Sequence, residues 1–270
     1  MERLTVVKVG GKIVEDAQSL ERLLGAFTNN ISGFKVLVHG GGRSATKLAA
    51  SLGLETTMVG GRRVTDKSML DVVTMVYAGL VNKNIVAQLQ ARGVNALGLT
   101  GADMNVMLSR KRPPVMVDAK VAGTDTDQLV DYGFVGDVER CDGEMLSKLI
   151  AEGIVPVMSP ITHDGMGSLL NTNADTIAGE TAMALAPFFD VTLVYCFEKA
   201  GVLSDENDDN SVIPQIDAAS FAELVKAGVI SGGMIPKIEN SLKACRTGVT
   251  KVVITHAEAI GQDCGTVIKL

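Results

Sequence analysis

The strongest constraint on the fold is a unit that occurs twice near the start of the chain: a short apolar run, a glycine cluster and a stretch with helical periodicity. The first run extends from Leu4 to Val9 and ends at two glycines, and the second extends from Lys35 to His39 and ends at three. Short runs rich in β-branched residues and bounded by turn residues are typical of buried strands. Strand, helix, strand and helix in this order predict a mostly parallel sheet with helices on both faces.

The rest of the chain continues this alternation of strands and helices. We expect further strands at about residues 96–99, 133–138, 154–159, 191–197, 251–255 and 266–268, and helices at about 43–52, 66–91, 142–151, 174–185, 218–227 and 235–247. We also predict a hairpin at 56–65, a break in the long helix near Gly79, a surface excursion with solvated charges at 106–121, a polar loop at 124–131 and a mobile acidic loop at 204–210. These elements place the chain in the α/β class.

Lys8 interrupts the first apolar run just before Gly10 and Gly11. An unpaired ammonium is costly to bury, so Lys8 should either reach solvent or meet an anion. Paired glycines at the end of a strand let a ligand approach the backbone and expose its N–H groups. Two interpretations remain open on this stretch alone: a phosphate-binding corner, and an edge-strand lysine followed by an ordinary turn.

The second glycine cluster, Gly40 to Gly42, formally matches a dinucleotide-binding fingerprint together with Ala45. That fingerprint also expects an acidic residue about 20 positions further on, where this chain has Arg62 and Arg63. A P-loop is absent, because Thr46 stands where its second glycine is needed. Two glycine-rich turns remain, each leading toward a helix, and together they favour an anion. Tight turns without a ligand are the alternative.

Three later segments carry further candidate binding groups. Arg63 lies in the far arm of the predicted hairpin and is suited to bidentate carboxylate binding, although a single arginine is more often a solvated charge. Asn171 to Asp175 lie between a strand and a helix, where they either point into a cleft at the end of the sheet or cap the helix. Lys237 lies near a helix N-terminus, where a cation is unfavourable unless an anion is present.

Composition narrows the function classes. The formal net charge is −6, so no basic excess points to nucleic acid or to an anionic membrane. The four cysteines form no CxxC pair and the three histidines have no zinc-site spacing, which indicates neither a metal cluster nor a redox pair. We find no secretory signal and no uninterrupted apolar stretch that we expect to span a bilayer, and therefore predict a cytoplasmic protein.

Six motifs in a fixed order carry a resemblance to a known family. They are V-K-V-G-G at 7–11, H-G-G-G at 39–42, G-R-R-V-T at 61–65, G-F-V-G-D-V at 133–138, N-T-N-A-D at 171–175 and G-G-M-I-P-K at 232–237. With these motifs the chain resembles the amino acid kinase family and, within it, the N-acetylglutamate kinases, over nearly its whole length. The resemblance implies a three-layer αβα sandwich around a mainly parallel open sheet.

The resemblance also implies a reaction and a division of the chain. The N-terminal lobe, residues 1–165, would bind the acylated amino acid and contribute to dimerisation, and the C-terminal lobe, residues 166–270, would bind ATP within one continuous fold. The reaction would transfer the γ-phosphoryl group of ATP to the side-chain carboxylate of an N-acylglutamate, as in arginine biosynthesis. Mg²⁺ would arrive on the ATP phosphates with few protein ligands.

Residue roles follow from the same resemblance. Lys8 and Lys237 would flank the migrating phosphoryl group, and Asp175 would hold the two lysines in place. Backbone N–H groups of Gly10, Gly11, Gly41 and Gly42 would bind phosphate oxygens, with Gly41 and Gly42 also touching the substrate. Arg63 would bind the α-carboxylate of the substrate and Asn171 its main-chain end. These roles suit phosphoryl transfer, in which positioning and charge stabilisation dominate and an ionised carboxylate needs no general base.

Departures from the family pattern leave other interpretations open. Cys196-Phe197-Glu198-Lys199 replaces the usual Ser/Thr-Asp-Val beside the nucleotide, so a regulator that binds nucleotide without catalysis is one alternative. N-succinylglutamate is another possible substrate, with Arg62 beside Arg63 suited to its extra carboxylate, and carrier-bound aminoadipate is a third. An aspartokinase would add regulatory domains, and carbamate kinase or glutamate 5-kinase would need different substrate contacts. Because the chain starts at its first strand, we expect a homodimer that arginine does not inhibit.

Overall fold

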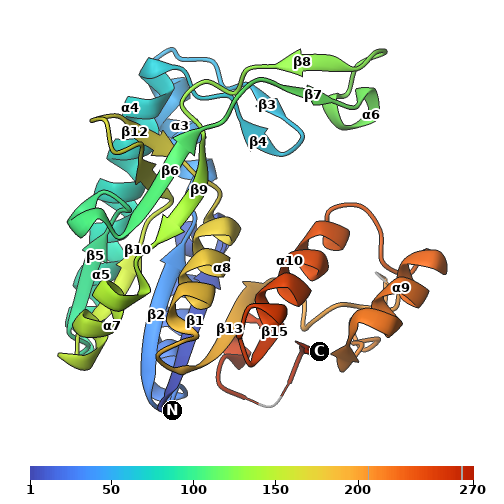
Figure 1. Cartoon of the computed structure of the whole chain (residues 1–270). Coiled ribbons are helices and arrows are strands. Elements are labelled where there is room, and N and C mark those ends of the chain that lie inside the picture. Colours follow the sequence, from blue (N-terminus) through green and yellow to red (C-terminus); the bar gives the residue numbers. More distant parts are fainter. Residues whose placement is uncertain (206, 263) are drawn as a thin grey trace.

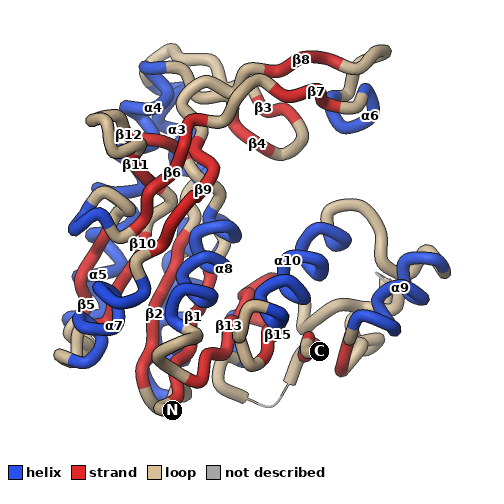
Figure 2. Tube along the Cα trace, in the orientation of Figure 1, coloured by secondary structure: helices blue, strands red, loops and turns tan. Residues whose placement is uncertain are grey.

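The computed structural model describes residues 1–205, 207–262 and 264–270 and is built on an eight-stranded sheet (Figures 1 and 2). Its strands are β1 (Arg3–Val9), β2 (Phe34–His39), β5 (Ala96–Leu99), β10 (Val155–Met158), β13 (Asp190–Phe197), β14 (Gln215–Ile216), β15 (Lys251–His256) and β16 (Thr266–Ile268). The order across the sheet is β14-β16-β15-β13-β1-β2-β10-β5. All neighbours pair in parallel except β15 and β16, so the predicted mainly parallel sheet is confirmed.

Helices cover both faces of this sheet, as predicted. They are α1 (Gly11–Glu15), α2 (Ala17–Asn29), α3 (Gly42–Ser51), α4 (Lys67–Thr74), α5 (Asn82–Gln90), α6 (Ala119–Ala122), α7 (Gly143–Ala151), α8 (Ala174–Leu185), α9 (Ala218–Lys226) and α10 (Met234–Arg246). Short 3₁₀ turns lie at Asp103–Asn105 and Ala257–Ala259. The sheet has one hydrophobic core on each face. The core on one face includes residues of α7, α8 and α10, and the core on the other includes residues of α2, α3, α4 and α5.

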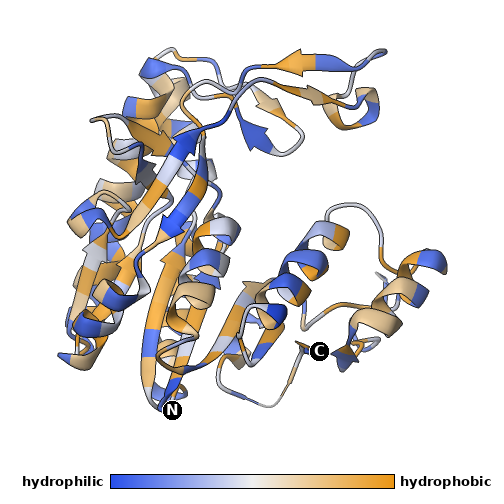
Figure 3. Cartoon of the chain, viewed as in Figure 1, coloured by the Kyte–Doolittle hydropathy of each residue, from blue (hydrophilic) through white to orange (hydrophobic). Residues whose placement is uncertain are grey.

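The strands of the main sheet are coloured mostly as hydrophobic residues (Figure 3). Side chains alternate along β1, which assigns each residue to one face of the sheet. Leu4 and Val6 pack in the core beneath α8 and α10, whereas Val7 and Val9 pack in the core beneath α2 and α3. Because every second side chain of a strand points to the same face, Lys8 lies with Leu4 and Val6 on the face of the sheet covered by α8 and α10. The strand buries apolar residues on both sides because helices cover both faces of a parallel sheet.

The long predicted helix contains the irregularity expected near Gly79. A π-helical turn at Met75–Val81 joins α4 to α5. The combined segment, Lys67–Gln90, is long and apolar enough by composition to cross a membrane, which the sequence reading had not recognised. Half of its most apolar window is buried in this fold, because residues such as Val73, Val76 and Ile85 belong to the core.

A second sheet of four strands, in the order β12-β11-β6-β9, lies beyond the first. Its strands are β6 (Met107–Lys111), β9 (Gly136–Cys141), β11 (Ile161–His163) and β12 (Leu169–Asn171), and β9 begins later than the strand predicted at 133–138. The predicted hairpin is confirmed as β3 (Met58–Val59) and β4 (Arg62–Arg63). Another pair, β7 (Val115–Val117) and β8 (Gln128–Val130), extends from the molecule.

Two expectations for this region were wrong. The segment 106–121 is not only a surface excursion, because β6 is a strand of the second sheet and Met107 and Ser109 are buried. Its charges are not all solvated: Arg112 donates from Nε to Asp137 Oδ1 at 3.0 Å and forms an ion pair with that carboxylate. The predicted polar loop at 124–131 contains β8. The loop predicted at 204–210 includes Glu206, which lies outside the described residues, and its mobility stays a prediction.

Candidate functional site

An ion pair joins the centre of the sheet to the first turn of α8. Lys8 Nζ lies 2.7 Å from Asp175 Oδ1, and the two side chains are 11% and 29% exposed. The alternation along β1 directs Lys8 toward α8, and Asn173 fixes the start of that helix by accepting from the backbone N–H groups of Asp175 and Thr176 at 2.8 and 3.2 Å. Lys8 therefore meets an anion inside the protein, as the cost of burying its ammonium requires.

Lys237 lies close enough to this pair to feel both charges. It belongs to the first turns of α10, whose N-cap Gly233 supplies no side-chain cap. Burial lowers the pKa of Lys237; Asp175 opposes this change and Lys8 reinforces it. Within the described part of the chain its ammonium forms no ion pair with Asp175 and lies over the Phe197 ring, 3.9 Å from the centroid. Phe197 therefore holds Lys237 through a cation–π contact.

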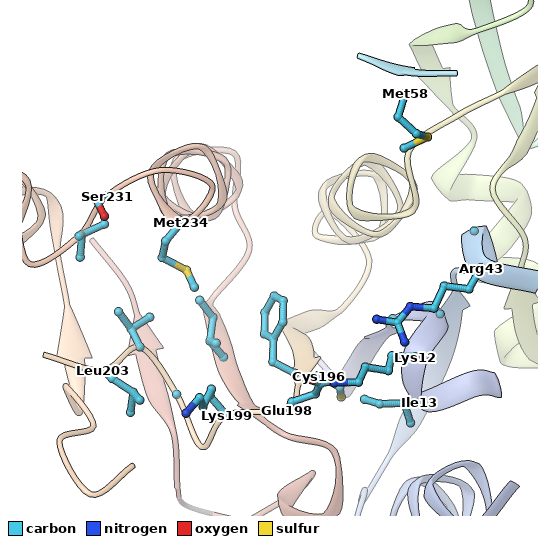
Figure 4. A pocket seen from close by; sticks show the side chains of 18 of the residues that line it. Lys12, Ile13, Arg43, Met58, Cys196, Glu198, Lys199, Leu203, Ser231 and Met234 are labelled. Carbon is cyan, nitrogen blue, oxygen red and sulfur yellow. The ribbon is translucent and has the colours of Figure 1, made fainter. Parts of the chain in front are cut away.

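A large cavity of about 860 Å³ opens beside these charges (Figure 4). Lys12, Ile13 and Arg43 stand on one side of it and Leu203, Ser231 and Met234 on the other, with Cys196, Glu198 and Lys199 between them (Figure 4). Its lining also includes Gly10, Gly11, Gly42, Arg63 and Phe197. A space of this size, with apolar walls and a few polar groups, suits a small-molecule ligand.

The unusual segment Cys196–Lys199, at the end of β13, lines this cavity. Glu198 makes an ion pair with Lys12, and Lys199 makes one with Asp209. Burial raises the pKa of the Cys196 thiol to about 12, so this group is neutral and unreactive near neutral pH. Glu198 and Lys199 are therefore both paired, in ion pairs that are exposed to solvent.

The two glycine turns touch each other beneath the cavity. A Cβ atom on Gly11 would lie 3.3 Å from the backbone nitrogen of Gly41, and one on Gly40 would lie 3.2 Å from the nitrogen of Gly11. Such contacts are tighter than a side chain tolerates without movement, which explains glycine at these positions. The helices that follow, α1 and α3, have glycine N-caps without a side-chain cap. Glu15 satisfies one N–H of α3 by accepting from Ser44 N at 2.6 Å.

His39 supports the second turn from below. It is fully buried, with Nδ1 2.8 Å from the Gly40 oxygen and Nε2 3.1 Å from Asn82 Nδ2. Both contacts are satisfied when Nδ1 carries the proton and donates to the carbonyl while Nε2 accepts from the amide. Burial lowers the pKa of His39 to about 4, so the neutral ring is the form that the fold contains.

The buried His39 predicts a loss of stability in mild acid. The unfolded chain takes up a proton near the ordinary pKa of 6.5, whereas the folded chain does so only near 4, so the free energy of unfolding decreases as pH falls through this window. We expect a decrease of roughly 2–3 kcal/mol. Urea unfolding between these two pH values measures it, and a His39→Gln variant should show a flatter profile. An unchanged slope in that variant would contradict the assignment.

A smaller cavity of about 210 Å³ adjoins the large one. Gly42, Met58 and Arg63 line both cavities, so the two spaces meet at these residues. The small cavity is also lined by Gly40, Gly41, Gly61, Arg62, Tyr77, Val135, Pro160, Asn171, Thr172, Asn173 and Ala174. Asn171 donates from Nδ2 to Thr65 Oγ1 at 3.0 Å, and no donor among the described residues bonds its Oδ1.

Arg63 ties the hairpin to α3. Its Nη2 donates to the Gly42 oxygen at 2.8 Å and to Thr46 Oγ1 at 2.9 Å, while Nη1 donates to Thr56 Oγ1 at 3.2 Å. Arg63 is only 8% exposed, and the acceptors around it are neutral. A carboxylate entering the cavity would form charge-assisted bonds, which are about twice as strong as the neutral ones it displaces.

The structure thus brings the sequence-predicted residues to one edge of the sheet. Gly10 and Gly11 line the large cavity, Gly41 and Asn171 the small one, and Gly42 and Arg63 both. Lys8, Asp175 and Lys237 line neither cavity, but their neighbours do: Ala174, next to Asp175 in the chain, lines the small cavity, and Phe197, whose ring Lys237 contacts, lines the large one. The ion pair predicted from Asp175 to both lysines is found only for Lys8.

Several supporting residues were missed by the sequence reading. Asn82 orients His39 from 43 positions away, and it also donates to the Val157 oxygen at 2.9 Å. Tyr77 packs on the second glycine turn, where a Cβ on Gly41 would lie 3.0 Å from its ring. The position of His39 directly before Gly40 was the available signal, because no local pattern in the sequence connects His39 with α5.

Comparison with known proteins places the chain among close relatives. The amino acid kinase family matches residues 3–256. The acetylglutamate kinase of Bacteroides fragilis is 66% identical over 99% of this chain and 97% of its own length, and that of Bacteroides thetaiotaomicron is 66% identical over 99% of both. Among solved structures, smu.665 of Streptococcus mutans has 27% identity and a TM-score of 0.73 over 98% of each chain. The chain therefore belongs to the amino acid kinase family.

Proposed function

We propose that the protein is an ATP-dependent kinase that phosphorylates the side-chain carboxylate of N-acetyl-L-glutamate, or of another N-acylglutamate, in arginine biosynthesis. The products are an acyl phosphate and ADP. Relatives with 66% identity over nearly their whole length carry the name acetylglutamate kinase, which supports this acceptor. The geometry that carries the proposal is the Lys8–Asp175 pair with Lys237 nearby, next to residues that line the two adjoining cavities.

The large cavity is the proposed ATP site. Its size and apolar walls fit a nucleotide, and the glycine cradle at Gly11 leaves backbone N–H groups free of side chains. Segments from the C-terminal lobe, residues 166–270, supply much of its lining, including Phe197, Val202 and Ile230. Mg²⁺ bound to the ATP phosphates would neutralise part of their charge. The described residues contain no cluster of three or more His, Cys, Asp or Glu side chains that could hold a metal ion.

The small cavity is the proposed acceptor site, formed mainly by the N-terminal lobe, residues 1–165. Arg63 would bind the α-carboxylate, because its guanidinium lines the cavity and is enclosed by neutral acceptors. Asn171 Oδ1 would accept the N–H of the acylated amine, while its Nδ2 is held by Thr65. These two contacts leave the side-chain carboxylate free to approach the junction with the large cavity.

Charge neutralisation is the proposed catalytic principle. A carboxylate must approach a polyphosphate, and the first obstacle is repulsion between the two anions. Lys8 and Lys237 would stabilise the charge that spreads over the transferring phosphoryl group, and Asp175 would fix the position of Lys8. The attacking carboxylate is already ionised at neutral pH, so the reaction needs no proton transfer. Backbone N–H groups of Gly10, Gly11, Gly41 and Gly42 would bind phosphate oxygens.

The experiment that tests this proposal is ADP release in the presence of ATP and Mg²⁺. We expect turnover with N-acetylglutamate or N-succinylglutamate and none with free glutamate, because an ammonium in place of the neutral amide adds a positive charge to a cavity already lined by two arginines, Arg62 and Arg63. Lys8→Ala and Lys237→Ala should both lower turnover strongly, by roughly 10³-fold for Lys8→Ala. If no N-acylglutamate supports ADP release while ATP still binds, the proposal fails and a nucleotide-binding regulator explains the altered Phe197–Lys199 segment better.

The assembly and location of the protein are further parts of the proposal. We propose a homodimer that arginine does not inhibit and that works in the cytoplasm. Gel filtration of the purified chain measures the first, and a hexamer would contradict it.

A further inference from the structure

Of the two lysines placed at the phosphoryl group, only Lys8 has a carboxylate partner among the described residues. Its Nζ lies 2.7 Å from Asp175 Oδ1, whereas Lys237 forms no ion pair in the part of the chain that the structure describes. Lys237 is nevertheless half-buried, and burial lowers its pKa. An ammonium that is partly removed from water needs a compensating partner. A group other than a carboxylate must therefore hold Lys237.

The ring of Phe197 supplies this partner. Lys237 Nζ lies 3.9 Å from the ring centroid, well within the range of about 6 Å over which the negative face of an aromatic ring attracts a cation. The three other contacts of this kind among the described residues have distances of 5.2, 5.4 and 5.9 Å. The contact between Lys237 and Phe197 is thus the closest of the four.

The end of β13 places this ring on the face of the sheet that carries Lys8. Lys8 pairs in register with Tyr195, and residues two apart on a strand share a face, so Phe197 lies on the same face. The Tyr195 and Phe197 ring centroids are 6.5 Å apart, and the Tyr195 hydroxyl donates to the backbone oxygen of Asp175 at 3.4 Å. The two rings therefore connect the Lys8–Asp175 pair with Lys237.

Helix α10 brings Lys237 close to the wall of the large cavity. Met234, one turn earlier on this helix, lines that cavity (Figure 4). Residues three apart are neighbours on the surface of a helix, so Lys237 lies on the same side of α10 as Met234. Phe197 lines the large cavity as well. The ammonium and the ring that holds it are thus both next to the proposed ATP site.

An aromatic ring holds a cation differently from a carboxylate. A carboxylate would cancel the charge of the ammonium, whereas the ring is neutral and leaves the positive charge available to an approaching anion. We infer that Phe197 is a positioning residue, whose ring fixes the Lys237 ammonium beside the large cavity and leaves its charge to stabilise the transferring phosphoryl group. This inference rests on the proposed function. It gives a role to the segment Cys196–Lys199, in which the chain departs from the family pattern.

The test changes the charge distribution of the ring and keeps its shape. Phe197 is replaced by phenylalanine carrying one, two or three ring fluorines, which withdraw negative charge from the ring faces. We expect kcat for ADP release with N-acetylglutamate to fall stepwise with each fluorine. Phe197→Leu keeps an apolar side chain without a π-face and should lower kcat roughly 5- to 30-fold, with a smaller change in KM for N-acetylglutamate. Phe197→Tyr keeps the π-face and should stay within a few-fold of the unmodified enzyme.

Phe188→Leu is the matched control. Phe188 is exposed, lies outside both cavity linings and has no cation over its ring among the described residues, so this variant should leave kcat unchanged. Equal kcat for the ordinary and the fluorinated rings would overturn the inference and leave the kinase assignment intact. A kcat of Phe197→Leu within two-fold of the unmodified enzyme would do the same.

An NMR titration of the lysine ammonium groups separates this inference from the proposed function. The signal of Lys237 is identified as the one that Lys237→Ala lacks. A ring that stabilises the charged form raises the pKa of the ammonium, so fluorination of Phe197 should lower the pKa of Lys237. A lowered pKa in a protein that releases no ADP would support the holding role of Phe197 and reject the kinase assignment. An unchanged pKa would overturn the inference, whether or not ADP is released.

Discussion

Replacing Lys8 by alanine should lower kcat for N-acylglutamate phosphorylation by roughly 10³-fold, comparable to the largest effects of removing one preorganised stabilising group from a transition state. The reason is geometric. Lys8 lies on the face of β1 that α8 and α10 cover, and its ammonium is held there by the ion pair with Asp175. Its ammonium therefore needs no reorganisation when charge develops on the transferring phosphoryl group. A coupled assay of ADP release measures kcat.

The control for this variant must separate lost catalysis from lost folding. Lys8→Ala leaves Asp175 partly buried without its cation, which should cost about 1–3 kcal/mol of stability. The double variant Lys8→Ala with Asp175→Asn should recover much of that stability and none of the activity. Lys67→Ala, an exposed lysine paired with Asp71, should leave kcat unchanged. Activity of Lys8→Ala within a few-fold of the unmodified enzyme would contradict a role at the phosphoryl group.

Replacing Arg63 by alanine should reduce kcat/KM for the N-acylglutamate by roughly 10²- to 10³-fold, mainly through KM. Arg63 provides a nearly buried guanidinium at the junction of the two cavities, and its loss removes both the α-carboxylate partner and the tie between the hairpin and α3. We therefore expect ATP affinity to change much less than substrate affinity. Steady-state kinetics with each substrate varied in turn measures the two effects.

Arg63→Lys distinguishes charge from shape at the same position. Lysine retains the positive charge and cannot bridge the Gly42 carbonyl, Thr46 and Thr56 simultaneously. We expect this variant to recover part of the substrate affinity and little of the thermal stability that Arg63→Ala loses. Equal KM values for the alanine variant and the unmodified enzyme would show that the α-carboxylate is bound elsewhere.

The main sheet and its glycine turns were predictable because their signals are local. Buried parallel strands such as β2 and β13 are near-continuous apolar runs. A glycine cluster directly follows each of the first two strands, β1 and β2. The second sheet was harder to predict. Strands such as β11 and β12 have only three residues each and pair across a short turn. Neither is long enough to show a recognisable alternation of apolar and polar residues.

The supporting contacts of the site could not be predicted from local patterns for a different reason. His39 and Asn82 meet because α5 packs against β5 and β10, and β10 pairs with β2. The ion pair of Arg112 forms because β6 pairs with β9. Both contacts join residues distant in the chain, so they depend on the completed packing. The contact between Lys237 and Phe197 also depends on the completed packing. A lysine near a helix N-terminus suggested an anion site, whereas the ring beneath its ammonium is visible only in the fold.

The strand order has a consequence for synthesis of the protein on the ribosome. β1 lies between β2, which follows it closely in the chain, and β13, which begins only at Asp190. At typical translation rates this second neighbour emerges roughly 10–40 s after β1. During that interval one edge of an apolar strand in the nascent chain has no partner, and a charged residue in such an edge discourages pairing with other chains. Lys8 would then protect the unfinished sheet from aggregation before it serves the finished enzyme.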